Sequence, residues 1–214
     1  MLHEDSALVC WRRADAVYYS DREKQILEER SGLSAGEGKN QKVMAMHLTG
    51  IALAELGSKM LQGSYYPIRT APGGKPYFAD GQLQFNISHS GEIVVCAFSC
   101  FPIGVDIETA HRDIRKIADR YYREDENTWI NENGYSNEKA ILLWSYKESY
   151  LKREGKGIGE IETIPSMVKD GKPVTELEGA RFFTRELDGG DRIVVCADET
   201  VTQIAWQEER ILYV

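Results

Sequence analysis

The chain has 214 residues, 42% of them apolar and 28% charged, so it can bury one core or two compact halves, and a long multidomain assembly is excluded. The formal net charge of -8 argues against broad binding to nucleic acid or anionic membranes, because both would repel the chain. The longest apolar run, from Ile93 to Phe98, is far shorter than the roughly 20 residues of a membrane-spanning helix. The acidic residues that follow His3 do not fit a secretion signal, which favours a cytoplasmic location.

The first part of the chain predicts two helices and then an irregular segment. The residues from Ser20 to Glu23 have the spacing of a capping box, which favours a helix that begins there and stops near Gly32. From about Asn40 to Leu56 apolar residues recur at helical spacing, and Gly57 is placed to end this long core helix. The stretch 63–81 holds three of the six prolines and several glycines, so we expect a loop.

Strands and two further helices are expected in the rest of the chain. Short apolar runs bounded by turn residues indicate strands, and apolar residues three or four apart indicate helices. The expected elements are strands at Gln84–Ser88, Ile93–Phe98 and Ile103–Glu108, a helix through Ile114–Tyr121, and a helix at Ala140–Glu154 ended by Gly155.

The cysteines do not indicate a metal site or a thiol enzyme. Cys10, Cys96, Cys100 and Cys196 have no paired spacing, and they lie mostly in apolar strand-like runs. Cysteine behaves there as a small apolar side chain, so we expect buried thiols.

Two short patterns occur twice, about a hundred residues apart. The segment Gly74-Lys75-Pro76 returns as Gly171-Lys172-Pro173, and Ile93-Val94-Val95-Cys96-Ala97 returns as Ile193-Val194-Val195-Cys196-Ala197. Unless short apolar strings match by chance, this predicts an α+β fold of two pseudo-symmetric α/β subdomains, each a small mostly antiparallel sheet packed with helices. We place the division at residues 1–108 and 109–214, and we expect a monomer because the two copies can pair within one chain.

Four polar side chains outside the repeated patterns are candidates for chemistry. Asp106 and Glu108 are two apart on an expected strand, so they leave the same face and either share a cation or end the strand in solvent. Glu148 and Lys152 are four apart on an expected helix, which suits an ordinary surface ion pair as well as a site. The neighbouring Ser88 and His89 point to opposite faces of a strand, so a serine hydrolase pair is disfavoured.

Three ordered motifs together resemble the signatures of the Sfp-type 4'-phosphopantetheinyl transferases. They are Phe85-Asn86-Ile87-Ser88-His89-Ser90-Gly91, then Ile103-Gly104-Val105-Asp106-Ile107-Glu108, then the segment from Trp144 to Gly157. The resemblance implies an enzyme that transfers the 4'-phosphopantetheine arm of coenzyme A to a serine of an apo carrier protein and releases 3',5'-ADP.

The same resemblance implies roles for the candidate residues. Asp106, Glu108 and Glu148 would bind Mg²⁺, or Mn²⁺ in its place, as oxygen ligands suit these ions. Glu148 would also be the base for the serine proton, and Lys152 would stabilise the leaving phosphate. Coenzyme A would be held by a further set of side chains: Lys75, Ser88, His89, and as weaker additions Arg69 and Lys42. Arg12 and Arg13 are candidates for its 3'-phosphate.

The expected partner is an apo acyl or peptidyl carrier protein, as in fatty-acid, polyketide or nonribosomal peptide biosynthesis. Four basic residues lie three or four apart on the helix expected after the third strand, and they form either a ridge for an acidic carrier or an ordinary solvated helix face: Arg112, Lys116, Arg120 and Arg123. The segment from Lys156 to Val168 offers Ile158, Ile161 and Ile164 for packing against a partner helix. The role of Glu126 stays open. Two alternatives are a non-catalytic coenzyme A-binding scaffold and a metal-dependent hydrolase of nucleotide pyrophosphates.

Overall fold

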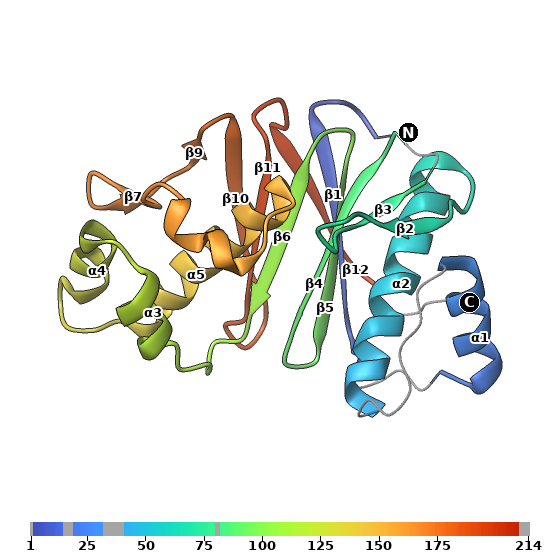
Figure 1. Cartoon of the computed structure of the whole chain (residues 1–214), viewed down its shortest axis with the longest axis horizontal. Helices are drawn as coiled ribbons and strands as arrows, with labels where there is room; N and C mark the ends of the chain where they lie inside the picture. Colours follow the sequence, from blue (N-terminus) through green and yellow to red (C-terminus); the bar gives the residue numbers. More distant parts are fainter. Residues whose placement is uncertain (1, 15–18, 32–40, 80–81, 210–214) are drawn as a thin grey trace.

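Two four-stranded sheets form the middle of the molecule, and helices cover their outer sides (Figure 1). The computed structural model describes residues 2–14, 19–31, 41–79 and 82–209, and all counts here refer to these ranges. The first sheet has the strand order β12-β1-β5-β4, and the second has the order β6-β11-β10-β9. The first sheet consists of β1 (Ser6–Arg13), β4 (Gln84–Ser90), β5 (Ile93–Ser99) and β12 (Gln203–Glu208); the second consists of β6 (Ile103–Glu108), β9 (Glu176–Leu177), β10 (Ala180–Glu186) and β11 (Arg192–Asp198). The expected α+β class is confirmed.

The buried strands explain why the sequence shows unbroken apolar runs there. Successive strand residues face opposite sides of a sheet. Val95 and Ala97 of β5 therefore face the second sheet, where they pack with Val105 of β6 and Val195 of β11 in one cluster. The alternate residues of β5 face the helix on the outer side. Both faces of β5 are therefore apolar, as in a strand covered on each side.

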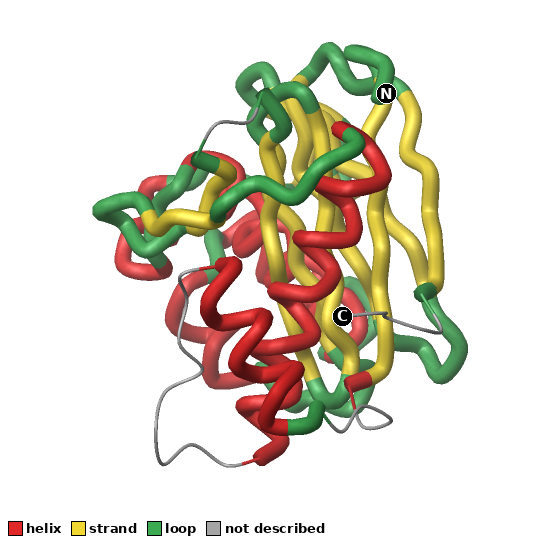
Figure 2. Tube along the Cα trace, turned by 90° about the vertical axis from the view of Figure 1, so that its right-hand side faces the viewer, coloured by secondary structure: helices red, strands yellow, loops and turns green. Residues whose placement is uncertain are grey.

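Helices cover each sheet on its outer side. Helices α1 (Asp21–Ser31) and α2 (Gln41–Gln62) lie over the first sheet, in front of its strands in Figure 2. The second sheet is covered by α3 (Arg115–Tyr121), α4 (Glu124–Asn131), α5 (Asn137–Glu154) and the 3-10 helix η2 (Ile158–Thr163). None of the helices within the described ranges combines the length and the apolar composition that crossing a membrane requires.

The predicted ends of three helices can be compared with the structure. Glu23 accepts a hydrogen bond from the Ser20 backbone at 2.7 Å, which confirms the capping box of α1. The expected stop of that helix at Gly32 and the expected start of the next one at Asn40 lie outside the described residues. Helix α5 ends as predicted at Gly155, whose φ of 70° is the left-handed conformation that glycine adopts easily.

The prediction that Gly57 ends the second helix is wrong. Helix α2 continues to Gln62. A Cβ atom at Gly57 would lie 2.1 Å from the Phe98 ring of β5, so this glycine lets the helix pack closely on the sheet.

The loop predicted for residues 63–81 contains a short hairpin. Strand β2 (Ile68–Thr70) pairs antiparallel with β3 (Pro76–Phe78), and their connection includes Gly74. In the second half β7 (Val168–Lys169) pairs with β8 (Lys172–Pro173) around Gly171. The repeated Gly-Lys-Pro pattern thus lies in a short hairpin in both halves, and both glycines have a positive φ, but the first connection has five residues (71–75) and the second has two (170–171).

Strand β6 belongs to the second sheet. It pairs antiparallel with β11, as β1 pairs antiparallel with β5 in the first sheet. The C-terminal strand β12 returns to the first sheet and pairs in parallel with β1. Strand pairing therefore favours a division of the two halves before β6, whereas the division after Glu108 stays a proposal.

The cysteines are buried or half-buried free thiols. Cys10, Cys96 and Cys196 are buried and Cys100 is half-buried, and none of them forms a disulfide. Burial raises the pKa of the Cys10 thiol to about 12, so it stays protonated at neutral pH. This agrees with the expected role of these cysteines as small apolar side chains.

Candidate active site

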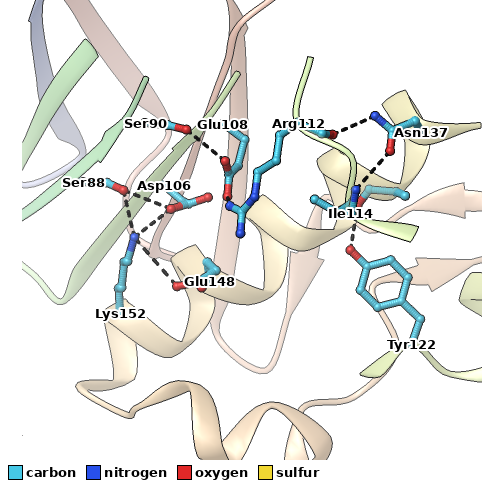
Figure 3. A network of polar contacts seen from close by, with 11 residues as sticks. Ser88, Ser90, Asp106, Glu108, Arg112, Ile114, Tyr122, Asn137, Glu148 and Lys152 are labelled. Atoms are coloured by element: carbon cyan, nitrogen blue, oxygen red, sulfur yellow. Dashed lines mark hydrogen bonds and ion pairs between the residues drawn. The ribbon is translucent and has the colours of Figure 1, made fainter. Parts of the chain in front are cut away.

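Polar side chains of β4 reach across to β6 where the two sheets meet. The two strands belong to different sheets, and three hydrogen bonds from consecutive even positions of β4 connect them. They join Asn86 Oδ1 to the Val105 backbone N–H at 2.9 Å, Ser88 Oγ to Asp106 Oδ1 at 3.0 Å, and Ser90 Oγ to Glu108 Oε2 at 3.0 Å. In Figure 3 both serines point toward the two acidic residues. This row of contacts holds Asp106 and Glu108 in place.

Helix α5 lies directly on β6 because residue 104 is a glycine. A Cβ atom there would lie 2.0 Å from the Ser149 carbonyl oxygen and 2.4 Å from the Arg153 nitrogen. No other residue fits without a shift of the helix. The close approach brings the Glu148 and Lys152 side chains of α5 next to the acidic pair of β6.

We expect Gly104→Ala to lower the free energy of unfolding by about 1 to 3 kcal/mol or more, because the added methyl group meets helix backbone. Urea denaturation followed by circular dichroism measures this change. Gly157→Ala is the matched control, since Gly157 has open space around it and a φ of -89°. Equal stability of the two variants would contradict the packing described here.

Lys152 links three of the candidate residues. Its Nζ lies 2.7 Å from Asp106 Oδ1 and 3.8 Å from Glu148 Oε2, and it donates a hydrogen bond to Ser88 Oγ at 2.9 Å. Two carboxylates from different elements thus share one ammonium group (Figure 3). Asp106, Glu148 and Lys152 therefore lie close together in the structure.

Glu108 is bound by another cation. Its Oε1 forms an ion pair with Arg112 in the loop after β6, while Oε2 accepts from Ser90. The Glu108 side chain is 5% exposed and the Arg112 side chain is 41% exposed. The sequence did not predict either partner of Glu108. Ser90 could have been found, because it is two residues from Ser88 and faces the same side of β4.

Burial and mutual repulsion raise the pKa values of two of the acidic groups. The pKa of Glu108 rises to about 7 because the carboxylate is buried and lies near Asp106, while Arg112 opposes the shift. Burial also raises the pKa of Glu148, and the charge of Lys152 opposes this. Clustered buried carboxylates favour a proton or a cation among them.

The donor set fits a hard divalent ion in part. Asp106 Oδ2 is buried and has no hydrogen-bond partner among the described residues, so one carboxylate oxygen is open to a further ligand. All three predicted ligands carry oxygen donors, the type that Mg²⁺ and Mn²⁺ prefer. In the described ranges no three acidic, histidine or cysteine side chains stand close enough to form a metal cluster as they are.

The predicted coenzyme A contacts come from several elements of the first half. Lys75 is half-buried and its Nζ donates to the carbonyl oxygens of Ile103 and Arg153, at 3.3 and 3.1 Å. It therefore lies against the start of β6 and the end of α5. Burial lowers the pKa of Lys75, which makes a neighbouring anion favourable.

The other predicted contacts, His89, Arg69 and Lys42, lie on β4, β2 and α2. His89 is largely exposed on the face of β4 opposite Ser88, and desolvation of its ring and the charge of Lys152 lower its pKa. Arg69 is exposed on β2. Lys42, on the first turn of α2, forms an ion pair with Glu92 at 3.1 Å. Arg12 has two buried guanidinium nitrogens, Nε and Nη1, with no hydrogen-bond partner in the described part of the chain.

Glu126 is part of a buried ion pair that the sequence did not reveal. Its Oε1 lies 2.9 Å from Lys147 Nζ, and both side chains are at most 1% exposed. The same carboxylate accepts from the backbone N–H groups of Met167 and Arg123, at 2.8 and 2.9 Å. The pair joins α4, α5 and the segment before β7, directly beside Glu148 on the helix.

The expected basic ridge does not form on one helix. Helix α3 spans only Arg115–Tyr121, so Arg112 lies before it and binds Glu108, and Arg123 lies after it. The Arg123 guanidinium donates to the carbonyl oxygen of Ile164 at 2.8 Å and is engaged within the fold. Only Lys116 and Arg120 of the four remain exposed on α3.

The segment after α5 is also packed more than predicted. It contains the 3-10 helix η2, in which Ile161 is buried, and Ile164 is buried just after it. Ile158 is 46% exposed. Of the three isoleucines proposed to meet a partner helix, only Ile158 is available on the surface.

The sequence is similar to that of known 4'-phosphopantetheinyl transferases. A family model described as the 4'-phosphopantetheinyl transferase superfamily matches residues 102–201, just under half of the chain, and this range includes β6 and α5. The 4'-phosphopantetheinyl transferase gsp of Aneurinibacillus migulanus is 44% identical over 87 residues, which is 40% of this chain and 36% of the relative. Sfp of Bacillus subtilis (strain 168) is 34% identical over 149 residues, or 63% of this chain and 66% of the relative.

A third similar protein is the 4'-phosphopantetheinyl transferase psf-1 of Bacillus pumilus, 37% identical over 136 residues, which is 59% of this chain and 58% of the relative. Each of these alignments spans less than two thirds of the relative's own length.

Proposed function

We propose that the chain is a member of the 4'-phosphopantetheinyl transferase superfamily, whose model matches residues 102–201, and that it transfers the 4'-phosphopantetheine arm of coenzyme A to a serine hydroxyl of an apo carrier protein. The other product is 3',5'-ADP. The observation that carries this proposal is the meeting of Asp106, Glu148 and Lys152 from two separate elements around one ammonium group. Transfer cleaves a pyrophosphate, whose oxygens need positive charge and whose attacker needs a base.

Asp106, Glu108 and Glu148 are the residues that would hold a divalent ion, Mg²⁺ or Mn²⁺. Asp106 Oδ2, which has no hydrogen-bond partner within the described ranges, and the raised pKa values of the two glutamates support this assignment. When bound, such an ion supplies positive charge to the pyrophosphate oxygens of coenzyme A.

Glu148 is proposed as the base that accepts the proton of the carrier serine. Burial raises its pKa, and a carboxylate with a raised pKa is a stronger base. Its backbone is fixed, since α5 rests on β6 at Gly104 and Lys147 anchors the neighbouring turn in the buried pair with Glu126. The backbone thus places this side chain beside Lys152, whose Nζ lies 3.8 Å from Glu148 Oε2.

Lys152 is proposed to stabilise the charge that develops on the leaving phosphate. Its ammonium group is bound by Asp106, Glu148 and Ser88, so its position is set before any substrate arrives. A preorganised charge of this kind lowers the barrier more than a mobile one.

Coenzyme A is proposed to lie along the first half and reach this cluster. Ser88, on β4, accepts a hydrogen bond from Lys152, and Lys75 donates to the Arg153 carbonyl oxygen at the end of α5. His89 on β4, Arg69 on β2 and Lys42 on α2 are proposed as further contacts, and Arg12 Nε and Nη1, which have no hydrogen-bond partner among the described residues, are proposed for a phosphate. The carrier is an acyl or peptidyl carrier protein, and we propose a cytoplasmic, monomeric enzyme.

We expect the purified protein, incubated with coenzyme A, Mg²⁺ and an apo carrier protein, to increase the carrier mass by one phosphopantetheine arm. Intact-protein mass spectrometry measures the gain, and a carrier with its acceptor serine changed to alanine is the control. No gain with fatty-acid, polyketide and nonribosomal-peptide carriers would refute the proposal. Release of 3',5'-ADP without any carrier would indicate a hydrolase, and tight coenzyme A binding without turnover would indicate a scaffold.

A further inference from the structure

Arg112 occupies a position that no sequence motif predicts. Its guanidinium forms the ion pair with Glu108 Oε1. The other Glu108 oxygen accepts from Ser90 at 3.0 Å. Both oxygens of this carboxylate therefore have donors from the chain itself, whereas Asp106 keeps Oδ2 without a partner in the described residues.

The backbone around Arg112 is fixed from the other side. Asn137, the first residue of α5, donates from Nδ2 to the Arg112 carbonyl oxygen at 2.8 Å, and its Oδ1 accepts from the Ile114 backbone at 3.3 Å (Figure 3). This side chain clamps the loop between β6 and α3 onto the start of α5. The position of Arg112 beside Glu108 is thus set by the fold.

The two members of the ion pair differ in exposure. Glu108 is nearly buried, while Arg112 reaches it from the solvent side with 41% of its side chain exposed. The Arg112 side chain can therefore move away from Glu108 into solvent without disturbing the core. A divalent ion that uses Glu108 as a ligand has to compete with it, because a carboxylate oxygen cannot serve both cations at full strength.

We propose that Arg112 is a built-in counterion of the Glu108 carboxylate that lowers the affinity of the site for divalent ions, with Asn137 as its positioning residue. The proposal rests on the proposed function only in taking Glu108 as a ligand. It adds a residue that sets how readily the site accepts an ion.

The test is Mn²⁺ binding to the full chain, measured by electron paramagnetic resonance of free Mn²⁺, first alone and then with saturating coenzyme A. We expect Arg112→Gln to bind Mn²⁺ about three- to tenfold more tightly than the wild type, in line with a partly exposed charged contact. Glu108→Gln should bind more weakly than the wild type. Circular dichroism and thermal melting show whether each variant is folded.

Arg115→Gln is the matched control, because it removes the same charge three residues away. Arg115 stacks on the Tyr135 ring, with 3.8 Å from its Cζ to the ring centroid, outside the acidic cluster. Its Mn²⁺ affinity should stay within about twofold of the wild type. If Arg115→Gln gains as much Mn²⁺ affinity as Arg112→Gln, the gain comes from the change in net charge alone, and the proposal is overturned.

Unchanged or weaker Mn²⁺ binding by Arg112→Gln would also overturn it, even if the wild type modifies a carrier. If the wild type shows no measurable binding, binding that emerges in Arg112→Gln supports the proposal, and no binding in either protein overturns it. The carrier mass gain decides the proposed function separately.

Discussion

We expect Glu148→Gln to transfer the phosphopantetheine arm about 10²- to 10⁴-fold more slowly than the wild type, the contribution usual for a positioned base. Glutamine keeps the size of the side chain but neither accepts the serine proton nor carries a charge for a cation. The measurement is the rate of carrier modification at saturating coenzyme A and carrier.

Glu138→Gln makes the same chemical change in the first turn of the same helix and is the control. Glu138 lies in an exposed ion pair with Arg192 at 2.9 Å, at the other end of α5. Its rate should match that of the wild type. A Glu148→Gln rate within a few fold of the wild type would remove Glu148 from the proposed machinery.

Lys147→Met is expected to lower the free energy of unfolding by about 3 to 5 kcal/mol, because it leaves the Glu126 carboxylate buried without its cation. Both side chains are at most 1% exposed, and the pair joins α4 to α5. Methionine fills much of the same volume, so the loss reports the unpaired charge more than a cavity. Urea denaturation followed by circular dichroism measures it.

A second change separates charge from shape in this pair. Adding Glu126→Gln to Lys147→Met removes the unpaired charge while one amide oxygen still accepts from the Met167 backbone, so part of the stability should return. Lys24→Met is the surface control, since its partner Asp21 is fully exposed and such pairs stabilise little. A Lys147→Met variant as stable as Lys24→Met would contradict the assigned role of the buried pair.

Strand positions and the α+β class could be predicted because burial on both faces leaves a plain apolar run. The residues from Ile93 to Phe98 form β5, and the repeated pattern near residue 193 forms β11, each flanked by two neighbours in its sheet. The capping box at Ser20 and the left-handed Gly155 are local signals, and both were predicted from neighbouring residues alone.

Glycine was harder to interpret, because one residue type serves two purposes. Gly57 suggested a helix end, yet it allows α2 to pack against Phe98. Gly104 permits the closest helix contact of the site, against the Ser149 carbonyl. Whether a glycine ends an element or admits a neighbour depends on the tertiary partner, which sequence spacing does not contain.

The site was predictable where strand or helix geometry relates its residues, and otherwise not. Alternation on β6 and the four-residue spacing on α5 correctly indicated which side chains share a face. The contacts of Arg112 with Glu108, and of Lys147 with Glu126, join elements whose packing is set by the whole fold. The basic ridge failed for the same reason, because α3 is too short to carry all four cations.

The central claim is that Asp106, Glu108 and Glu148 gather around one divalent ion. A crystal structure with coenzyme A and Mn²⁺, with the ion located by its anomalous scattering, tests it most directly. We predict a single peak within about 2.0 to 2.6 Å of an oxygen from each of the three carboxylates, the range of hard-ion coordination, with Arg112 moved away from Glu108. A peak elsewhere, or one that leaves Glu148 beyond coordination distance, would contradict the account.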